Sequence, residues 1–156
     1  MPYFIHATTQ ALIICCLTLS CYTPIAIAYS YQIFSPDRQT NVEISVPEFV
    51  SQEQTFSYTI TYQGQTLLTD AKAWLDIKNA NYGMISQYRL QSAIKSQVDQ
   101  TVYPVVKQKS AQIRDNYQEI TFTFDQGLAL YFRVYNNGVA YRFSTEQSTP
   151  FQVVNE

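Results

Sequence analysis

The fold is decided by residues 117–143, which read YQEITFTFDQGLALYFRVYNNGVAYRF. Apolar residues occupy every second position before Asp125-Gln126-Gly127, between it and Asn137-Gly138, and again after that pair. Such alternation is typical of a half-buried β-strand. Asn-Gly is also the strongest short signal for a hairpin, because both turn positions of that hairpin need a positive φ. The stretch therefore predicts two consecutive antiparallel hairpins that share one apolar face.

The two turns also predict which residues lie opposite each other. A three-residue loop at 125–127 and a two-residue turn at 137–138 bring apolar residues of neighbouring strands face to face. A slip of one residue in either hairpin would send these side chains to opposite faces, so the hydrophobic pattern selects this register. The predicted pairs are Phe124 with Leu128, Phe122 with Leu130, Ile120 with Phe132, Val134 with Tyr141, and Phe132 with Phe143.

The other face of the hairpins then carries charged and aromatic side chains. We expect Glu119 opposite Arg133, and Arg133 opposite Arg142. Two adjacent arginines repel each other, so the row needs a carboxylate beside them. Tyr117 is expected opposite Tyr135, where the rings are candidates for contact with a sugar or another domain. The row is either structural, which we favour because such pairs are common and weak when exposed, or an anion or sugar site or a docking face.

Alternation elsewhere predicts further strands. Residues 42–46 and 56–62 alternate apolar with polar side chains, and Gln63-Gly64 offers a tight turn into the next strand. Residues 71–77 alternate again around Trp74. Trp74 could stack on a sugar ring or contact another domain, but we favour core packing because large aromatic side chains are mostly buried.

Residues 87–99 are ambiguous. Leu90, Ile94 and Val98 fit a helical spacing, whereas serine and glutamine are frequent between them. We expect a loop or a short helix there. No repeat and no domain boundary interrupts the rest, so the sequence predicts one all-β domain, an antiparallel β-sandwich.

Composition bounds the class of protein. The chain has 156 residues, enough for one domain of ordinary size. Its net charge is −2, which does not indicate a nucleic-acid-binding protein. Aromatic residues make up 15% of the chain and include 13 tyrosines, a composition that favours strands.

The start of the chain has the layout of a secretory signal. No charged side chain precedes Asp37, and the apolar run 11–19 is too short to span a bilayer as a helix. Ala26-Ile27-Ala28 then supplies the small-x-small pattern of a cleavage site. We expect residues 1–28 to be removed, residues 29–156 to form the mature domain, and the protein to be secreted or periplasmic with no membrane span. The alternatives are a short buried helix, a wrongly assigned start codon, or a lipid anchor on Cys21.

Cleavage after Ala28 would remove every cysteine and the one histidine: His6, Cys15, Cys16 and Cys21. The mature chain would then lack disulfides, zinc sites of the usual kind and imidazole bases. Acid–base chemistry would fall to carboxylates, lysine or tyrosine. We therefore expect no cofactor in this chain, and we reject a free-standing sugar epimerase because it needs a catalytic histidine.

Several of these segments resemble glycoside hydrolase family 97. Residues 132–143 are similar to the family's "FRxYNDGxAFRY" motif, and residues 104–105 and 113–120 to its "PVWGE…IRNxYNEL" stretch. Ser35-Pro36-Asp37 resembles the mature start of the family, and residues 151–156 the strand that follows the long motif. The resemblance covers essentially the whole mature chain.

The resemblance implies α-glucosidases and α-galactosidases of bacterial envelopes. Their N-terminal domain is a β-super-sandwich of the galactose-mutarotase type, and it precedes a catalytic (β/α)₈ barrel with the catalytic carboxylates. A calcium ion near the active site takes one glutamate from the N-terminal domain. In this sequence the family's Trp-Gly pair is replaced by Val106-Lys107, and the segments expected to hold the barrel and the calcium-binding glutamate lie beyond Glu156.

No catalytic or metal residue therefore carries over to this chain. We expect a truncated N-terminal domain with an incomplete sandwich, which supports a catalytic barrel and has no turnover of its own. The alternative is a stand-alone, non-catalytic carbohydrate-binding or interaction module. The reading frame downstream of Glu156 would separate the two hypotheses.

Overall fold

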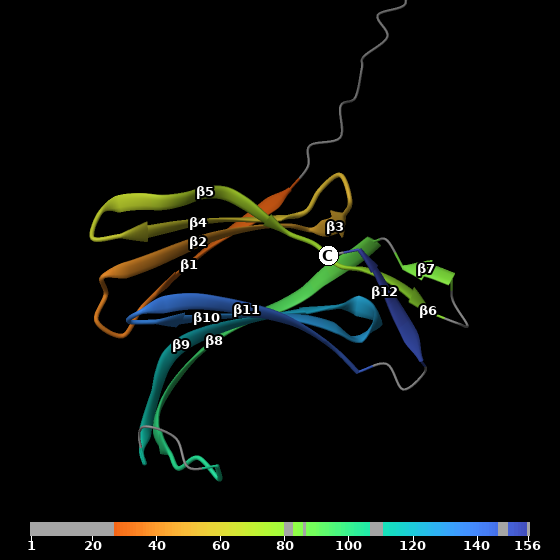
Figure 1. Ribbon diagram of the computed structural model, residues 1–156. Coiled ribbons are helices and arrows are strands. Elements are labelled where there is room, and N and C mark those ends of the chain that lie inside the picture. The colour runs from red at the N-terminus through yellow and green to blue at the C-terminus, as the bar shows by residue number, and fades with distance from the viewer. Residues whose placement is uncertain (1–26, 80–82, 86, 107–110, 147–149, 156) are drawn as a thin grey trace, which may run out of the picture.

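A computed structural model describes residues 27–79, 83–85, 87–106, 111–146 and 150–155. Apart from one short 3₁₀ turn, the regular elements of these ranges are all strands (Figure 1). They are β1 (Ala28–Phe34), β2 (Thr40–Pro47), β3 (Phe49–Ser51), β4 (Phe56–Tyr62), β5 (Gln65–Ala73), β6 (Asp76–Asn79), β7 (Gly83–Ile85), β8 (Gln87–Val102), β9 (Ile113–Phe124), η1 (Asp125–Gly127), β10 (Leu128–Tyr135), β11 (Gly138–Thr145) and β12 (Phe151–Asn155).

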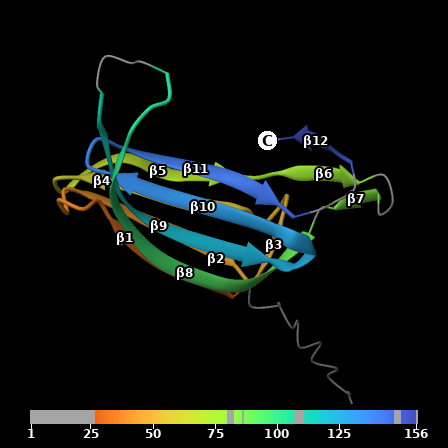
Figure 2. The same ribbon diagram turned by 90° about the horizontal axis from the view of Figure 1, so that it is seen from below.

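The strands form two facing sheets with a smaller sheet at one end (Figures 1 and 2). The first sheet has the order β1-β2-β4-β5 and the second β11-β10-β9-β8-β3, while β12-β6-β7 form the small one. Neighbouring strands pair antiparallel, as expected for an all-β sandwich. The strands predicted at 42–46 and 56–62 are confirmed as β2 and β4.

The core lies between the two large sheets. Each sheet contributes apolar residues at every second position, and rings of the two sheets meet edge to face. The centroids of Tyr31 and Phe122 are 5.1 Å apart, and those of Phe56 and Phe124 are 5.2 Å apart. The fully buried side chains include Val42, Ile44, Val46, Val50, Phe56, Ile120, Phe122, Phe124, Leu130, Phe132 and Val134.

The first predicted hairpin has the expected register. Phe122 pairs with Leu130 and Ile120 with Phe132 across β9 and β10. The connection is the tight turn η1, in which Gln126 and Gly127 have φ values of 59° and 72°. The left-handed conformation needed at the end of the loop is therefore supplied by glycine, as the sequence indicates.

The second hairpin differs from the prediction by two residues. Tyr135 pairs with Gly138, so the turn is Asn136-Asn137 and not Asn137-Gly138. None of these turn residues has a positive φ, and Gly138 is the first residue of β11. Phe132 consequently pairs with Tyr141, and Arg133 with Ala140. A slip of two residues keeps every side chain on the same face, which is why the hydrophobic pattern could not detect it.

The prediction of a loop or short helix at 87–99 is wrong, because these residues belong to β8. The ladder with β9 passes from Leu90 opposite Phe124 to Ser92 opposite Thr123, so the pairing skips one residue. This bulge reverses the order of faces along the strand. Leu90 and Ala93 both reach the core, whereas Ile94 is 62% exposed. The helical spacing of the apolar residues is therefore produced by a bulged strand.

Residues 71–77 are not one strand as predicted. β5 ends at Ala73 and β6 starts at Asp76, and the two belong to different sheets. Residues 73–77 are all buried at this crossing. The alternation of apolar and polar residues therefore continues through the point where the chain passes from the first sheet to the small sheet.

The β8–β9 hairpin extends beyond the sandwich as an arm (Figure 1). β9 pairs with β10 only as far as Tyr117, whereas its ladder with β8 continues to Ile113 opposite Val102. Arg114 donates two hydrogen bonds to Asp99 across the arm, at 2.9 and 2.8 Å.

The predicted signal segment lies outside the described residues as far as residue 26, and Ala28 begins β1. In the part of the chain that is described, no helix is long and apolar enough to cross a membrane.

Candidate functional site

The outer face of β9 and β10 carries a partly buried ion pair. Arg133 and Glu119 lie opposite each other in the ladder, as predicted, and Arg133 Nε donates a 2.5 Å hydrogen bond to Glu119 Oε2. The Glu119 side chain is only 13% exposed and that of Arg133 33%. The hydrogen bond from this guanidinium to Glu119 raises the arginine pKa still further above its ordinary range. Arg133 therefore stays charged, and the pair is partly shielded from water.

Two tyrosines hold the same arginine in place. Tyr117 lies opposite Tyr135, with ring centroids 5.1 Å apart, as predicted. The guanidinium of Arg133 lies 4.4 Å from the centre of the Tyr117 ring, within the range of a cation–π contact. Burial raises the pKa of the Tyr117 hydroxyl. Tyr117 is 5% exposed, and Arg133 lies over its ring.

Arg142 does not lie opposite Arg133, which corrects the predicted row. It pairs with Tyr131, one step further along the same face, and its guanidinium is 4.7 Å from the Tyr131 ring centre. The described residues give Arg142 no salt bridge. The outer face therefore holds two arginine–tyrosine stacks, Arg133 on Tyr117 and Arg142 on Tyr131. Glu119 neutralises the charge of Arg133, whereas Arg142 keeps its positive charge.

A shallow groove of about 160 Å³ separates these stacks on the outer face. Tyr131 was not among the predicted site residues, although it lies at the outward-facing positions of the alternating stretch and could have been found from that pattern. We call the following residues the outer groove: Tyr131, Arg133, Tyr135, Ala140, Tyr141 and Arg142.

Trp74 is buried, as the core interpretation predicted. It is 9% exposed and packs against Tyr88, with ring centroids 6.3 Å apart. Its Nε1 has no hydrogen-bond partner in the described structure. Nearby in sequence, Asp76 is 2% exposed and accepts a 2.9 Å hydrogen bond from Gln52.

A polar network ties the two sheets together at the hairpin end of the molecule. Ser35 is fully buried, and its hydroxyl donates to Asp37 at 2.6 Å and accepts from the Thr40 amide at 2.9 Å. The Asp37 amide in turn donates to the Asn136 side chain at 3.1 Å. Ser35-Pro36-Asp37 therefore links the β1–β2 turn to the β10–β11 turn.

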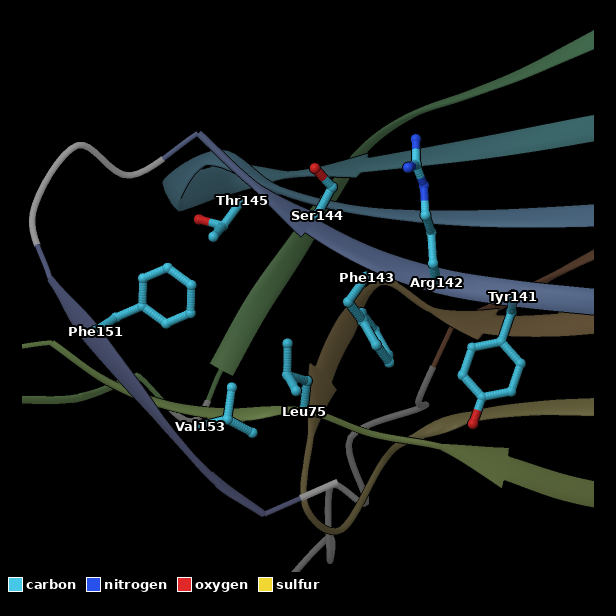
Figure 3. Close-up of a pocket in the computed structure, with 8 residues that line it drawn as sticks. All are labelled: Leu75, Tyr141, Arg142, Phe143, Ser144, Thr145, Phe151 and Val153. Atoms are coloured by element: carbon cyan, nitrogen blue, oxygen red, sulfur yellow. The ribbon is translucent and has the colours of Figure 1, made fainter. Parts of the chain in front are cut away.

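Two cavities larger than the outer groove are lined by described residues. The cavity in Figure 3 has a volume of about 400 Å³ and lies between β11 and β12. A second, of about 540 Å³, lies near the β10–β11 turn. Their linings contain no carboxylate, whereas glycoside hydrolysis of the common type needs two facing each other across a sugar. Within the described ranges, no group of three or more histidine, cysteine, aspartate or glutamate side chains is placed to hold a metal ion.

Comparison with known proteins gives one consistent answer. The family profile described as "Glycosyl-hydrolase 97 N-terminal" matches residues 33–156. The "Retaining alpha-galactosidase" of Bacteroides thetaiotaomicron is 26% identical over 141 residues, which cover 90% of this chain and 20% of that protein.

Two solved structures share the fold. A glycoside hydrolase family 97 enzyme from Pseudoalteromonas sp. strain K8, in complex with acarbose, aligns with a TM-score of 0.58 and 16% identity over 79% of this chain and 19% of its own. A β-arabinopyranosidase aligns with a TM-score of 0.56 and 20% identity, over 76% and 18%. The chain thus spans about a fifth of the length of the relatives it matches. With the profile matching most of its length, it belongs to the N-terminal domain family of glycoside hydrolase family 97.

Proposed function

We propose that this chain is an exported, non-catalytic β-sandwich that packs against the catalytic (β/α)₈ barrel of a family 97 glycoside hydrolase. The observation that carries this proposal is the profile match over residues 33–156, combined with relatives of which this chain covers only a fifth. The barrel, and with it the catalytic carboxylates and the calcium ion, belongs to polypeptide outside this chain.

The outer groove is the surface we assign to that contact. Arg133 is fixed between Glu119 and Tyr117, and a preorganised guanidinium loses little side-chain entropy on binding. Arg142 keeps an uncompensated charge beside the Tyr131 ring. Arginine and tyrosine are enriched at protein interfaces, where their stems and rings are buried while their polar ends find partners.

A second candidate, a stand-alone carbohydrate-binding module, is favoured by the same groove. Its tyrosine hydroxyls and guanidinium groups could donate hydrogen bonds to sugar oxygens. The groove is shallow and the faces of Tyr117 and Tyr131 are covered by arginines. We therefore rank sugar binding below domain contact.

The two functions are separated by binding measurements. We expect this chain to bind the remaining four fifths of a family 97 enzyme, and Arg142→Ala to weaken that binding about tenfold, the loss of one interface contact of about 1.4 kcal/mol. Lys72→Ala, on the exposed β5 of the other sheet, is the charge-matched control and should leave binding unchanged. Binding of α-galactosides or α-glucosides by the chain alone, abolished by Arg142→Ala, would favour the module instead.

Catalysis gives an independent test of the proposed function. Purified chain should leave aryl α-glucosides and α-galactosides intact, since no carboxylate pair faces the described cavities. Turnover above that of a mock preparation, lost on changing one aspartate or glutamate, would contradict the non-catalytic assignment.

A further inference from the structure

One long side of the sandwich is open. β5 is the last strand of the first sheet and β11 the last strand of the second. Figures 1 and 2 show these two edge strands on the same side of the molecule. No described strand pairs with the outer edge of either, so the core between them is closed on that side by side chains alone.

Both large cavities lie along this opening. Val139 contributes to the 540 Å³ cavity together with Ile60 and Leu67 of the first sheet. Further along the same strand, Tyr141 and Phe143 line the 400 Å³ cavity (Figure 3). The inward-facing residues of β11 therefore form one continuous apolar surface that runs from one cavity to the other.

The core aromatics reach solvent through this opening. Tyr141 is 39% exposed although its ring lies 5.6 Å from that of the fully buried Phe132 and 6.0 Å from that of Tyr58. On the opposite edge, Leu67 is 65% exposed. Apolar surface of this kind on an unpaired edge is a site for pairing with a further strand.

The backbone of β11 presents its free groups at the same three residues. Tyr135 and Gly138 close a two-residue turn, and the Glu146 amide donates a 3.0 Å hydrogen bond to the Gly127 carbonyl. Hydrogen-bonded pairs alternate along an antiparallel ladder, so Ala140 and Arg142 bond to β10. Val139, Tyr141 and Phe143 accordingly direct their N–H and C=O groups away from β10, into the opening.

A second copy of this chain fits the edge poorly. Antiparallel self-pairing of β11, which spans residues 138–145, would bring Arg142 of one copy close to Arg142 of the other near the centre of the new ladder. Like charges placed opposite each other destabilise such a pair.

A strand of the longer polypeptide fits better. Phe151 and Val153 of β12 line the cavity in Figure 3, so β12 itself lies beside the opening. The alignment covers 20% of the α-galactosidase, so a polypeptide of that length has ample residues to provide the strand.

We propose that the edge of β11 is a strand-acceptor site. Its occupant is an extended segment of the family 97 polypeptide outside this chain, which pairs with β11 and places apolar side chains at alternate positions into the two cavities. The inference rests on the proposed function, because it requires this chain to act as one part of a longer enzyme. Main-chain hydrogen bonds provide the affinity of such a pairing, and the cavities provide its specificity.

Amide hydrogen exchange, followed by NMR, tests the proposal residue by residue. The 156-residue chain is compared with a protein extended by the residues encoded directly after Glu156. In the short chain the amides of Val139, Tyr141 and Phe143 exchange fast and those of Ala140 and Arg142 slowly. In the extended protein, the first three become protected at least about tenfold, because a new ladder covers them.

A matched pair of proline variants separates the edge from the existing ladder. Val139→Pro removes an outward amide, so it leaves the β10–β11 ladder in place but reduces the new protection of Tyr141 and Phe143 in the extended protein. Ala140→Pro removes an amide bonded to β10 and destabilises the short chain itself.

Three results would overturn the proposal. The first is an extended protein that folds while the three amides exchange as fast as before. The second is a short chain that already protects these amides in a dimer detected by sedimentation, and the third is a downstream reading frame that encodes no polypeptide. Association with the barrel is measured separately. Protection of the three amides without barrel binding would retain the strand-acceptor site and reject the proposed function. Barrel binding without protection of the amides would retain the proposed function and reject the strand-acceptor site.

Discussion

Glu119 binds Arg133 across β9 and β10, and Asp99 binds Arg114 across β8 and β9. The two ion pairs differ in how far they are exposed to water. The Glu119 side chain is 13% exposed, whereas the Asp99 side chain is 47% exposed. We expect Glu119→Gln to lower the free energy of unfolding by about 1.5–3 kcal/mol, the range for hydrogen bonds to charged groups.

The exposed pair provides the matched control. Asp99→Asn should cost under about 1 kcal/mol, because Asp99 and Arg114 keep their contact with water. Urea titrations of the two variants measure both values. Equal losses would show that burial does not distinguish the pairs.

Asp37 gives a residue-scale prediction for pH. The Ser35 hydroxyl, and then the Gln39 amide, donate to its carboxylate and lower its pKa from the ordinary 3.8. A carboxyl with a lowered folded pKa contributes stability above pH 3.8, and loses it as the pH falls through the folded value. The urea midpoint of Asp37→Asn should therefore fall below that of the wild type at pH 6. The gap should shrink as the pH falls below 3.8, and a constant gap would contradict the assignment.

The candidate site could be predicted from the sequence only in part. Glu119 opposite Arg133 and Tyr117 opposite Tyr135 follow from the glycine-bearing loop at 125–127, whose left-handed residue fixes the register of the first hairpin. Arg142 depends on the second hairpin, where a slip of two residues preserves every face. Only the turn conformation decides between the two registers, and Asn136-Asn137-Gly138 is compatible with both.

At the scale of elements, glycine substitutions test the corrected turn. Gly138 lies in β11 with no positive φ and no atom within 4 Å of an added Cβ. Gly138→Ala should therefore stabilise the protein by about 0.4–1 kcal/mol, because alanine restricts the unfolded chain. An Asn137-Gly138 turn, with a positive φ at Gly138, would instead make the variant unstable.

Gly64 is the control for that experiment. It also has open space around its Cβ position, but its φ is +81° in the Gln63-Gly64 turn between β4 and β5. Gly64→Ala should cost about 1–2 kcal/mol from backbone strain alone. Thermal unfolding of both variants against the wild type measures the difference.

Strand β8 and the crossing from β5 to β6 were predicted wrongly, because the spacing of apolar residues carries no information about sheet topology. The bulge between Leu90 and Ser92 turns a period of two into an apparent helical spacing, and no glycine or proline marks it. At Trp74 and Leu75 the alternation continues although the chain moves from one sheet to another. In both cases the partner strand, which is distant in sequence, determines the structure.

At the scale of the whole molecule, the processing of the N-terminus stays a prediction. Cleavage between Ala28 and Tyr29 would leave Tyr29 as the first residue and shorten β1 by the Ala28–Pro47 pair. It would also remove the contact in which Ile27 accepts a 3.0 Å hydrogen bond from the Glu48 amide. N-terminal sequencing of exported protein should begin at Tyr29. A product that keeps Cys21 would contradict the cleavage site and restore a thiol to the mature chain.

The order of strands in the two large sheets also bears on how the chain folds. The first sheet is built entirely from residues 28–73, and the second, apart from the three residues of β3, from residues 87–145. Each sheet therefore assembles from neighbouring hairpins, whose loops are short and inexpensive in entropy to close. Because neither sheet can bury its apolar face alone, we expect the docking of the two halves to limit the rate of folding. β3, which leaves the first half to pair with β8, is the element we expect to align the halves for that step.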